Sequence, residues 1–370
     1  MPKKFLIVHL VSNGDCIMAT TLAKQIKADN PGCHLTWAIS YKCRQVIDEN
    51  PFVDKIWEVN FGQGESAYND IWYKIKQEAE ERKRKGEFDE IIYSQIYPDN
   101  VHYYDGTIRS STFRAYSKAI TVDVTPTIRL NEKEILRVKE FASKYKLESY
   151  KYVLLCECAP SSGQSYLTPE LMLRIALSIV ESRKDILFII STHLKLETNN
   201  GQIIDASELT YRENAELSKY CSLLIGCSSG ITWLLTSDWA KKINTVQFLY
   251  DSTKASHFAS VIYDFEYFKL STERIIESTT EDEIQMRSII LSSIDNFSQA
   301  KRNYSEVLSP SLVFLKNQAY RFYNYPNFSE KIKIFYAVHV FFKRNKTSFT
   351  DRIKFFSSIS NHLFKKLIKF

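Results

Sequence analysis

Apolar residues in the first part of the chain form short continuous runs that alternate with segments of helical spacing. The run Phe5–Val11 is mostly apolar, which is typical of a strand covered on both faces. Between Asp15 and Asp29, apolar residues recur three or four positions apart, and Asn30-Pro31-Gly32 ends the segment. This alternation predicts a parallel α/β sheet, with helices also at 65–85 and 110–119. Its other predicted strands are His34–Ile39, Lys55–Val59 and Phe88–Ser94.

A second series of the same kind follows a charged helical connector at Asn131–Tyr150. Its predicted strands are Tyr152–Cys158, Ile186–Ser191, Ile203–Asp205, Leu223–Gly226 and, closing the series, Thr245–Leu249. Its predicted helices are Pro169–Ser182, Thr210–Tyr220 and Ile231–Trp239. The pattern predicts two Rossmann-like domains that face each other across a cleft. Ligands of such sheets bind beside the carboxyl ends of the strands, so the cleft is the expected site.

Composition fits this division of the chain. The 370 residues are 44% hydrophobic and 25% charged, as in a soluble protein of two domains. We expect domains at 1–130 and 151–315, the connector at 131–150, and a helical tail at 316–370. The seven cysteines are scattered without zinc-ligand spacing, which favours reduced thiols in a cytoplasm. Uncharged apolar stretches are too short for a membrane span.

The tail carries the basic charge of the chain. From Lys331 to Phe370 there are ten basic residues and one acid, so the other residues sum to −3 of the overall +6. We expect no nucleic-acid partner, because the run at 83–85 is typical of a solvated helix end. Basic residues interleave with two apolar stripes, namely Ile332, Phe335, Val338 and Phe342, then Phe349, Ile353, Phe356, Leu363 and Leu367.

Two interpretations of these stripes are open. They indicate an anionic-membrane anchor or a helix that packs back on the core. We expect packing for part of Asn317–Phe342 and membrane binding for Phe349–Phe370, which would place the protein peripherally on the inner face of the cytoplasmic membrane.

The turn Ser12-Asn13-Gly14-Asp15 joins the first strand to the first helix. A glycine there allows a sharp turn close to a ligand. Asp15 falls at a helix N-terminus, where a negative charge is favoured. At the edge of a cleft its carboxylate could accept a proton from an attacking hydroxyl. From spacing alone, a simple helix cap is the commoner role.

The second candidate turn follows the strand Leu223–Gly226. The N–H groups of Ser229, Gly230 and Ile231, with the hydroxyls of Ser228 and Thr232, predict an anion site. An ordinary strand–loop–helix corner is the alternative. Neither turn has the spaced glycines of a dinucleotide or Walker motif.

Taken together, these segments resemble glycosyltransferase family 9, the heptosyltransferase-like group of GT-B enzymes. The matching segments are Phe5–Leu10, Asn13-Gly14-Asp15, Met18–Leu22, Asn30-Pro31-Gly32, Asn50–Ile56, Glu208-Leu209, Asn214–Leu217, Leu224-Ile225-Gly226 and Ser229–Leu234. They cover about residues 4–250 in the family's order. The resemblance implies a GT-B fold and an inverting, metal-independent sugar transfer. It implies that Asp15 is the base, that Ser228, Ser229, Gly230 and Thr232 hold the donor phosphates, and that no cofactor is needed.

One loop departs from the family pattern. Family members usually place a lysine after a Pro-Gly-Ala stretch, whereas this chain has Ser161, Ser162, Gly163 and Gln164 without a basic residue. Either backbone N–H groups and Gln164 replace the lysine, or the donor differs from ADP-heptose. Glu157, at the preceding strand end, could bind ribose hydroxyls, and His193 and His257 are weaker candidates.

We therefore expect a transferase that moves a sugar from a nucleotide-sugar donor to a lipid-linked glycan acceptor of lipopolysaccharide or capsule type. Two alternatives stay open: a nucleotide-sugar epimerase of the same fold, and a catalytically degenerate scaffold at the membrane.

Overall fold

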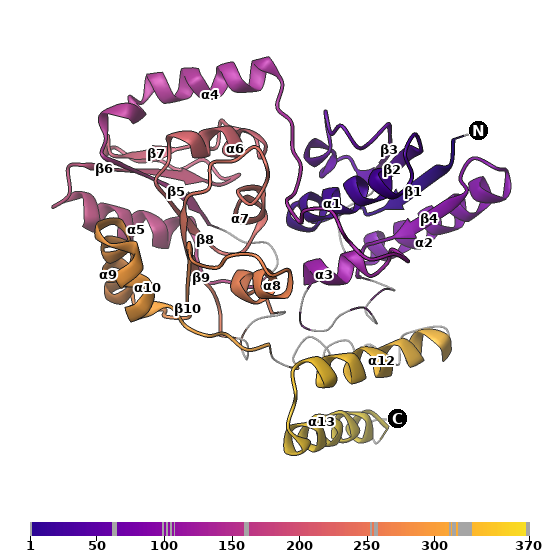
Figure 1. Ribbon diagram of the computed structural model, residues 1–370. Helices are drawn as coiled ribbons and strands as arrows, with labels where there is room; N and C mark the ends of the chain where they lie inside the picture. The colour runs from indigo at the N-terminus through magenta and orange to yellow at the C-terminus, as the bar shows by residue number, and fades with distance from the viewer. Residues whose placement is uncertain are drawn as a thin grey trace.

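The computed structural model describes residues 2–60, 65–97, 100, 103, 106, 108–158, 163–251, 254, 258–310, 312, 316 and 328–367. It contains two separate parallel sheets with helices packed around each, and a pair of helices at the C-terminal end (Figure 1). The predicted α/β class is therefore confirmed.

The N-terminal sheet has the order β3-β2-β1-β4, and its four strands run parallel. Its strands are β1 (Lys4–Val8), β2 (His34–Ser40), β3 (Lys55–Val59) and β4 (Glu90–Tyr93). Phe5, Leu6, Ile7 and Val8 are all buried, because helices cover both faces of the central strand. The helices of this part are α1 (Asn13–Asp29), the 3-10 turn η1 (Arg44–Val46), α2 (Glu65–Arg84) and α3 (Ile108–Phe113).

The C-terminal sheet has the order β10-β9-β8-β5-β6-β7 and is also parallel. Its strands are β5 (Tyr152–Glu157), β6 (Ile186–Ser191), β7 (Ile203–Asp205), β8 (Leu223–Gly226), β9 (Asn244–Phe248) and β10 (Ile275–Ser278). The prediction that the series closes at Leu249 was wrong. The run Ile275–Ser278 adds a buried edge strand, which is too short to give a clear signal of its own.

Helices around this sheet are shorter than their apolar patterns predicted. The segment predicted as one helix at 210–220 is split into a short helix and a 3-10 turn, and the helix predicted at 231–239 ends at Leu234. The elements are α4 (Glu132–Lys144), η3 (Leu147–Ser149), α5 (Pro169–Val180), α6 (Glu213–Leu217), η4 (Ser218–Tyr220), α7 (Gly230–Leu234), α8 (Val261–Tyr267), α9 (Glu283–Asp295) and α10 (Phe297–Tyr304).

Local sequence signals fix several helix starts. Asn131 and Glu134 form a reciprocal capping box at the start of α4. Thr168 accepts a hydrogen bond from the Leu171 N–H, and Pro169 occupies the first position of α5.

A buried guanidinium, that of Arg212, joins the two halves of the molecule. It donates to the backbone carbonyls of Gln45 (3.0 Å) and Asp48 (2.8 Å) in the N-terminal half. It also donates to the Arg129 carbonyl and pairs with Glu134 at 2.7 Å, both of which belong to the segment between the sheets. One side chain thus fixes three parts of the chain, because the planar fork of arginine offers donors in several directions.

The C-terminal helices α12 (Phe328–Arg344) and α13 (Phe349–Leu367) form a hairpin below the two sheets in Figure 1. Val338, Phe341 and Phe342 of α12 are buried against Phe355 of α13. The Arg344 guanidinium lies 4.2 Å from the centre of the Tyr267 ring on α8. The hairpin is therefore attached to the C-terminal half. Among the helices that the structure describes, none combines the length and apolarity needed to cross a bilayer.

We expect Arg212→Ala to lower the free energy of unfolding by about 3–5 kcal/mol, because it leaves the half-buried Glu134 carboxylate and several backbone carbonyls without their donor. Chemical denaturation measures this loss, and Arg212→Lys should fall between the two proteins because it keeps the charge without the fork. Arg174→Ala is the matched control: Arg174 pairs with Glu283 on the surface, and its loss should cost less than about 1 kcal/mol. Equal losses at Arg212 and Arg174 would contradict the assignment of Arg212 as a joint.

Candidate functional site

A cavity of about 760 Å³ lies between the two halves, at the carboxyl ends of the strands. The N-terminal wall comes from the turn after β1, together with Gln45, Tyr68 and residues 95–97. Residues after β5, β6 and β8, with part of the segment 207–214, form the opposite wall. The structure therefore has a cavity between the two halves, at the position where the sequence predicted the site.

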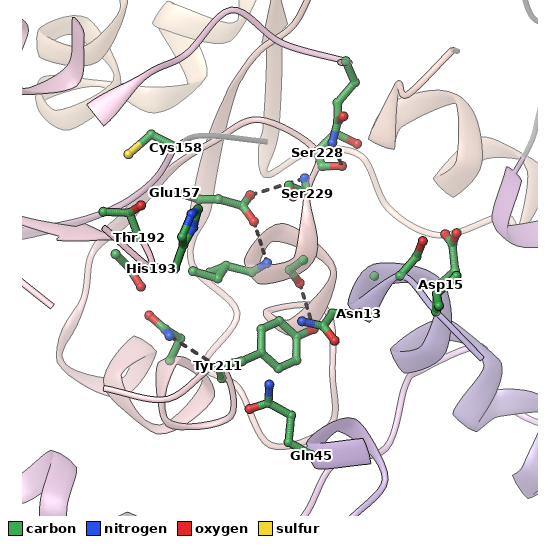
Figure 2. Close-up of a pocket in the computed structure, with 18 of the residues that line it drawn as sticks. Asn13, Asp15, Gln45, Glu157, Cys158, Thr192, His193, Tyr211, Ser228 and Ser229 are labelled. Atoms are coloured by element: carbon green, nitrogen blue, oxygen red, sulfur yellow. Dashed lines mark hydrogen bonds between the residues drawn. The ribbon is translucent and has the colours of Figure 1, made fainter. Parts of the chain in front are cut away.

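The turn after β1 places Asp15 on the N-terminal wall. Ser12 is the N-cap residue of α1 and has a left-handed backbone (φ 73°), whereas Gly14 lies within the helix. The sharp turn predicted at the glycine is thus made by a serine. Asp15 is half-buried and lines the cavity with Ser12, Asn13 and Gly14, and Figure 2 shows it facing the cavity from α1. Asp15 thus lies at the cavity, and its role as the base stays a prediction.

In the turn after β8, several of the donors predicted to form an anion site make hydrogen bonds within the chain. The Ile231 N–H donates to the Glu157 carboxylate at 2.6 Å, and the Thr232 N–H does so at 3.2 Å. The Thr232 hydroxyl donates to the same carboxylate at 2.6 Å, and the Ser228 hydroxyl donates to the Ala259 carbonyl at 2.5 Å. Ser228, Ile231 and Thr232 therefore already donate to acceptors within the protein, and their role in holding donor phosphates stays a prediction.

Ser229 and Gly230 keep unused donors in this turn. The Ser229 hydroxyl and the Gly230 N–H have no hydrogen-bond partner among the residues described, and both residues line the cavity. A Cβ at Gly230 would lie 3.1 Å from the Tyr211 ring and 3.5 Å from Asn13 Cβ. Glycine therefore allows the starts of α7 and α1 to approach each other across the cleft.

Glu157 ends β5 and was predicted to bind ribose hydroxyls. Its buried carboxylate accepts hydrogen bonds from the Ser229 and Ile231 N–H groups of the turn after β8, and Figure 2 shows Glu157 beside Ser229. Burial raises the pKa of Glu157, and the hydrogen bonds from Thr232 and Ile231 oppose that rise.

The loop that lacks the family lysine contributes one described residue to the cavity. Gln164 donates from Nε2 to the Ser228 carbonyl at 3.2 Å, and its own Oε1 is buried without a partner in the structure described. Gly163 is exposed and is not among the residues that line the cavity, so its role in donor binding stays a prediction. Ser161, Ser162 and His257 lie outside the described residues.

Several cavity residues were not predicted from the sequence. Tyr211 donates its hydroxyl to the Gly230 carbonyl at 2.9 Å, and Gln95 accepts from the Leu10 N–H at 2.8 Å. Asn214 donates to the Thr210 carbonyl at 3.0 Å and presents an unpartnered Oδ1 within the described structure. Polar residues just after strand ends are a signal that could have found Gln95. His193, predicted as a weaker candidate, does line the cavity.

The neighbouring turn, after β9, is held by a second buried carboxylate, Glu277 of β10. It accepts from the Ser260 hydroxyl and the Val261 N–H, both at 2.6 Å, at the start of α8. Burial raises the pKa of Glu277 to about 7. Glu277 is not among the residues that line the cavity. It is therefore a structural counterpart of Glu157 outside the site.

Comparison with solved structures shows proteins of the same fold. The glycosyl transferase family 9 protein from Veillonella parvula superposes with a TM-score of 0.52 at 15% identity, over 80% of this chain and 93% of its own. ADP-heptose lps heptosyltransferase II of E. coli superposes with a TM-score of 0.52 at 13% identity, over 80% of this chain and 99% of its own. The chain shares their fold. The predicted resemblance is thus confirmed for the fold. No family model and no curated protein sequence matches the chain.

We expect Glu277 to make the fold less stable as the pH rises. The folded-state pKa of about 7 lies above the ordinary value of 4.5, so the folded state holds the proton more tightly than the unfolded state. The stabilisation is complete below about pH 4.5 and is lost as the pH rises to about 7, a loss of about 3 kcal/mol. Glu277→Gln mimics the protonated carboxyl. Denaturation of both proteins across this range should show the wild type losing stability relative to the variant, and parallel curves would contradict the assignment.

Proposed function

We propose that the protein is an inverting glycosyltransferase that uses a nucleotide-sugar donor. The observation that carries this proposal is Asp15 on one wall of an interdomain cavity, opposite the turn after β8, within a fold shared with two glycosyltransferases. Fold alone does not define an activity, so the proposal depends on the site as well.

The proposed reaction uses Asp15 as a general base. The acceptor hydroxyl gives its proton to the Asp15 carboxylate while its oxygen bonds to the anomeric carbon. The bond between that carbon and the donor phosphate oxygen breaks, and the oxygen keeps the electron pair. Attack from the face opposite the leaving group inverts the anomeric centre. The Ser229 hydroxyl and the Gly230 N–H are the groups of the β8–α7 turn still able to donate to that oxygen.

The acceptor in this proposal is a lipid-linked glycan of lipopolysaccharide or capsule type, and the reaction runs at the cytoplasmic face of the membrane without a metal ion. The heptosyltransferase resemblance supports this choice, as does the charge of the tail. The exposed side chains of α13 include Phe349 (78% exposed), Ile353 (53%) and Phe356 (44%), near Lys346, Arg352 and Lys354. This combination suits an anionic membrane surface. The side chains of Ile332, Phe335, Leu363 and Leu367 lie outside the described part of the tail.

A catalytically degenerate scaffold is the second candidate. It is favoured by the cavity lining, which among the described residues includes two carboxylates, Asp15 and Glu157, and no lysine or arginine. Such a lining offers a nucleotide diphosphate little electrostatic attraction. Turnover separates the two candidates, because a scaffold forms no product.

We expect Asp15→Asn to lower kcat for sugar transfer by about 10²–10⁴-fold, because general-base assistance contributes that much. Binding of the nucleotide should stay within a few fold, as measured by calorimetry. Glu170→Gln removes an acid from the first turn of α5, outside the cavity lining, and should leave kcat unchanged. Full activity of Asp15→Asn would rule out this mechanism. Donor epimerisation without an acceptor would instead favour the epimerase.

We expect the full-length variant with Phe349→Ser, Ile353→Ser and Phe356→Ser to bind anionic vesicles at least tenfold more weakly than the wild type, because each substitution removes apolar area available for insertion. Co-sedimentation with phosphatidylglycerol-containing vesicles measures the change. Ile284→Ser, at an equally exposed apolar side chain on α9 (77% exposed), is the control and should bind normally. If the triple variant binds as well as this control, α13 is not the anchor.

A further inference from the structure

The turn after β8 contains an anion of its own. The Glu157 carboxylate accepts from three groups at or below 3.2 Å, namely the Ile231 N–H, the Thr232 N–H and the Thr232 hydroxyl. The Ser229 N–H adds a longer contact at 3.4 Å. Backbone N–H groups that follow a parallel strand are the usual place for a ligand phosphate. Here the two oxygens of the Glu157 carboxylate already accept from these N–H groups.

The carboxylate is held firmly in this position. Gln247 of β9 accepts from the Ser228 N–H at 2.6 Å, and its Oε1 lies 3.2 Å from the Thr232 hydroxyl that donates to Glu157. A Cβ at Gly226 would lie 2.4 Å from Gln247 Nε2, so the strand end leaves no space for rearrangement. Glu157 is therefore fixed by its surroundings as well as by its own hydrogen bonds.

The position of Glu157 distinguishes it from a purely structural carboxylate. Glu277 makes the same kind of bonds to the next turn, but it is outside the cavity lining. Glu157 lines the cavity, together with Ser229 and Gly230 of the turn that it holds. Any phosphate that reaches the unused donors of Ser229 and Gly230 must therefore lie next to a negative charge.

We propose that Glu157 is a specificity-determining residue, whose resident carboxylate takes the Ile231 and Thr232 donors of the turn after β8 and weakens the binding of the leaving nucleotide at Ser229 and Gly230. This inference rests on the proposed transferase activity only for its consequence in turnover. Transfer breaks the bond between the anomeric carbon and the phosphate oxygen, so the departing diphosphate carries one more negative charge than it did in the donor. A fixed carboxylate therefore repels the product more strongly than the donor, which favours product release.

The test compares Glu157→Gln with Glu277→Gln and the wild type. Both substitutions replace a buried carboxyl group that accepts backbone hydrogen bonds, but only Glu157→Gln does so at a residue that lines the cavity. Calorimetry with inorganic pyrophosphate is the primary measurement. We expect pyrophosphate to bind Glu157→Gln about tenfold more tightly than it binds the other two proteins. ADP, UDP, GDP and CDP should show the same order, and the gain should shrink at high salt.

A second measurement uses the wild type alone and does not depend on a stable variant. If Glu157 repels a diphosphate, each nucleoside monophosphate should bind at least as tightly as its diphosphate. Diphosphates that bind the wild type tenfold more tightly than monophosphates would overturn the proposal. So would unchanged or weaker pyrophosphate binding by a folded Glu157→Gln. The weaker result would instead indicate that Glu157 contacts the ligand directly.

If the protein is not a transferase, the experiments give a different result from a failure of the Glu157 proposal. In that case no nucleotide sugar is turned over by the wild type, whereas the pyrophosphate comparison still reports on Glu157. Steady-state product inhibition completes the separation: in an active enzyme, Glu157→Gln should lower the inhibition constant of the nucleoside diphosphate more than the KM of the donor.

Discussion

The hydrogen bonds of Arg212 are the constraint on which the cavity depends. A parallel sheet places its potential ligand-binding groups at the carboxyl ends of its strands, so two such sheets share a site only when those ends face each other. Arg212 bonds to carbonyls of Gln45 and Asp48 and to Glu134, and so holds the N-terminal half and the connecting segment against the start of α6. Its neighbour Tyr211 contacts Gly230 and lines the cavity. Arg212, which connects the two halves, and Tyr211, which lines the cavity, are therefore adjacent in the chain.

Within the C-terminal half, the main constraint is that the backbone N–H groups at the helix starts need hydrogen-bond acceptors. Short helices after β8 and β9 begin with N–H groups that have no partner within the helix. Glu157 and Glu277, each from a strand of the same sheet, supply the missing acceptors. This solution orders the turns without a ligand. Its consequence is a negative charge at the cavity, where many nucleotide-binding folds offer free donors.

The sequence predicted the features that depend on neighbouring residues. Continuous apolar runs predicted the strands, and the capping residues Asn131 and Thr168 predicted two helix starts. Both features depend on residues only a few positions apart. The same local reasoning put Asp15 at a strand-to-helix turn. It could not predict that Glu157 would fill the turn after β8, since that bond joins residues 74 positions apart. Nor could it predict Arg212, whose partners Gln45 and Asp48 lie more than 160 positions away.

The backbone of the two facing turns completes this picture. Ser12 and Ser228, which follow β1 and β8, are both left-handed (φ 73° and φ 52°), a conformation that L-residues adopt at a cost. Each is held by bonds that leave little freedom: the Ser12 carbonyl accepts from the Asp15 and Cys16 N–H groups, and Ser228 donates to Gln247 and Ala259. Hydrogen bonds within the protein therefore hold both residues in this backbone conformation before any ligand binds. Asp15 and Ser229, the residues that these turns present to the cavity, are consequently positioned by the fold and need little rearrangement to meet a substrate.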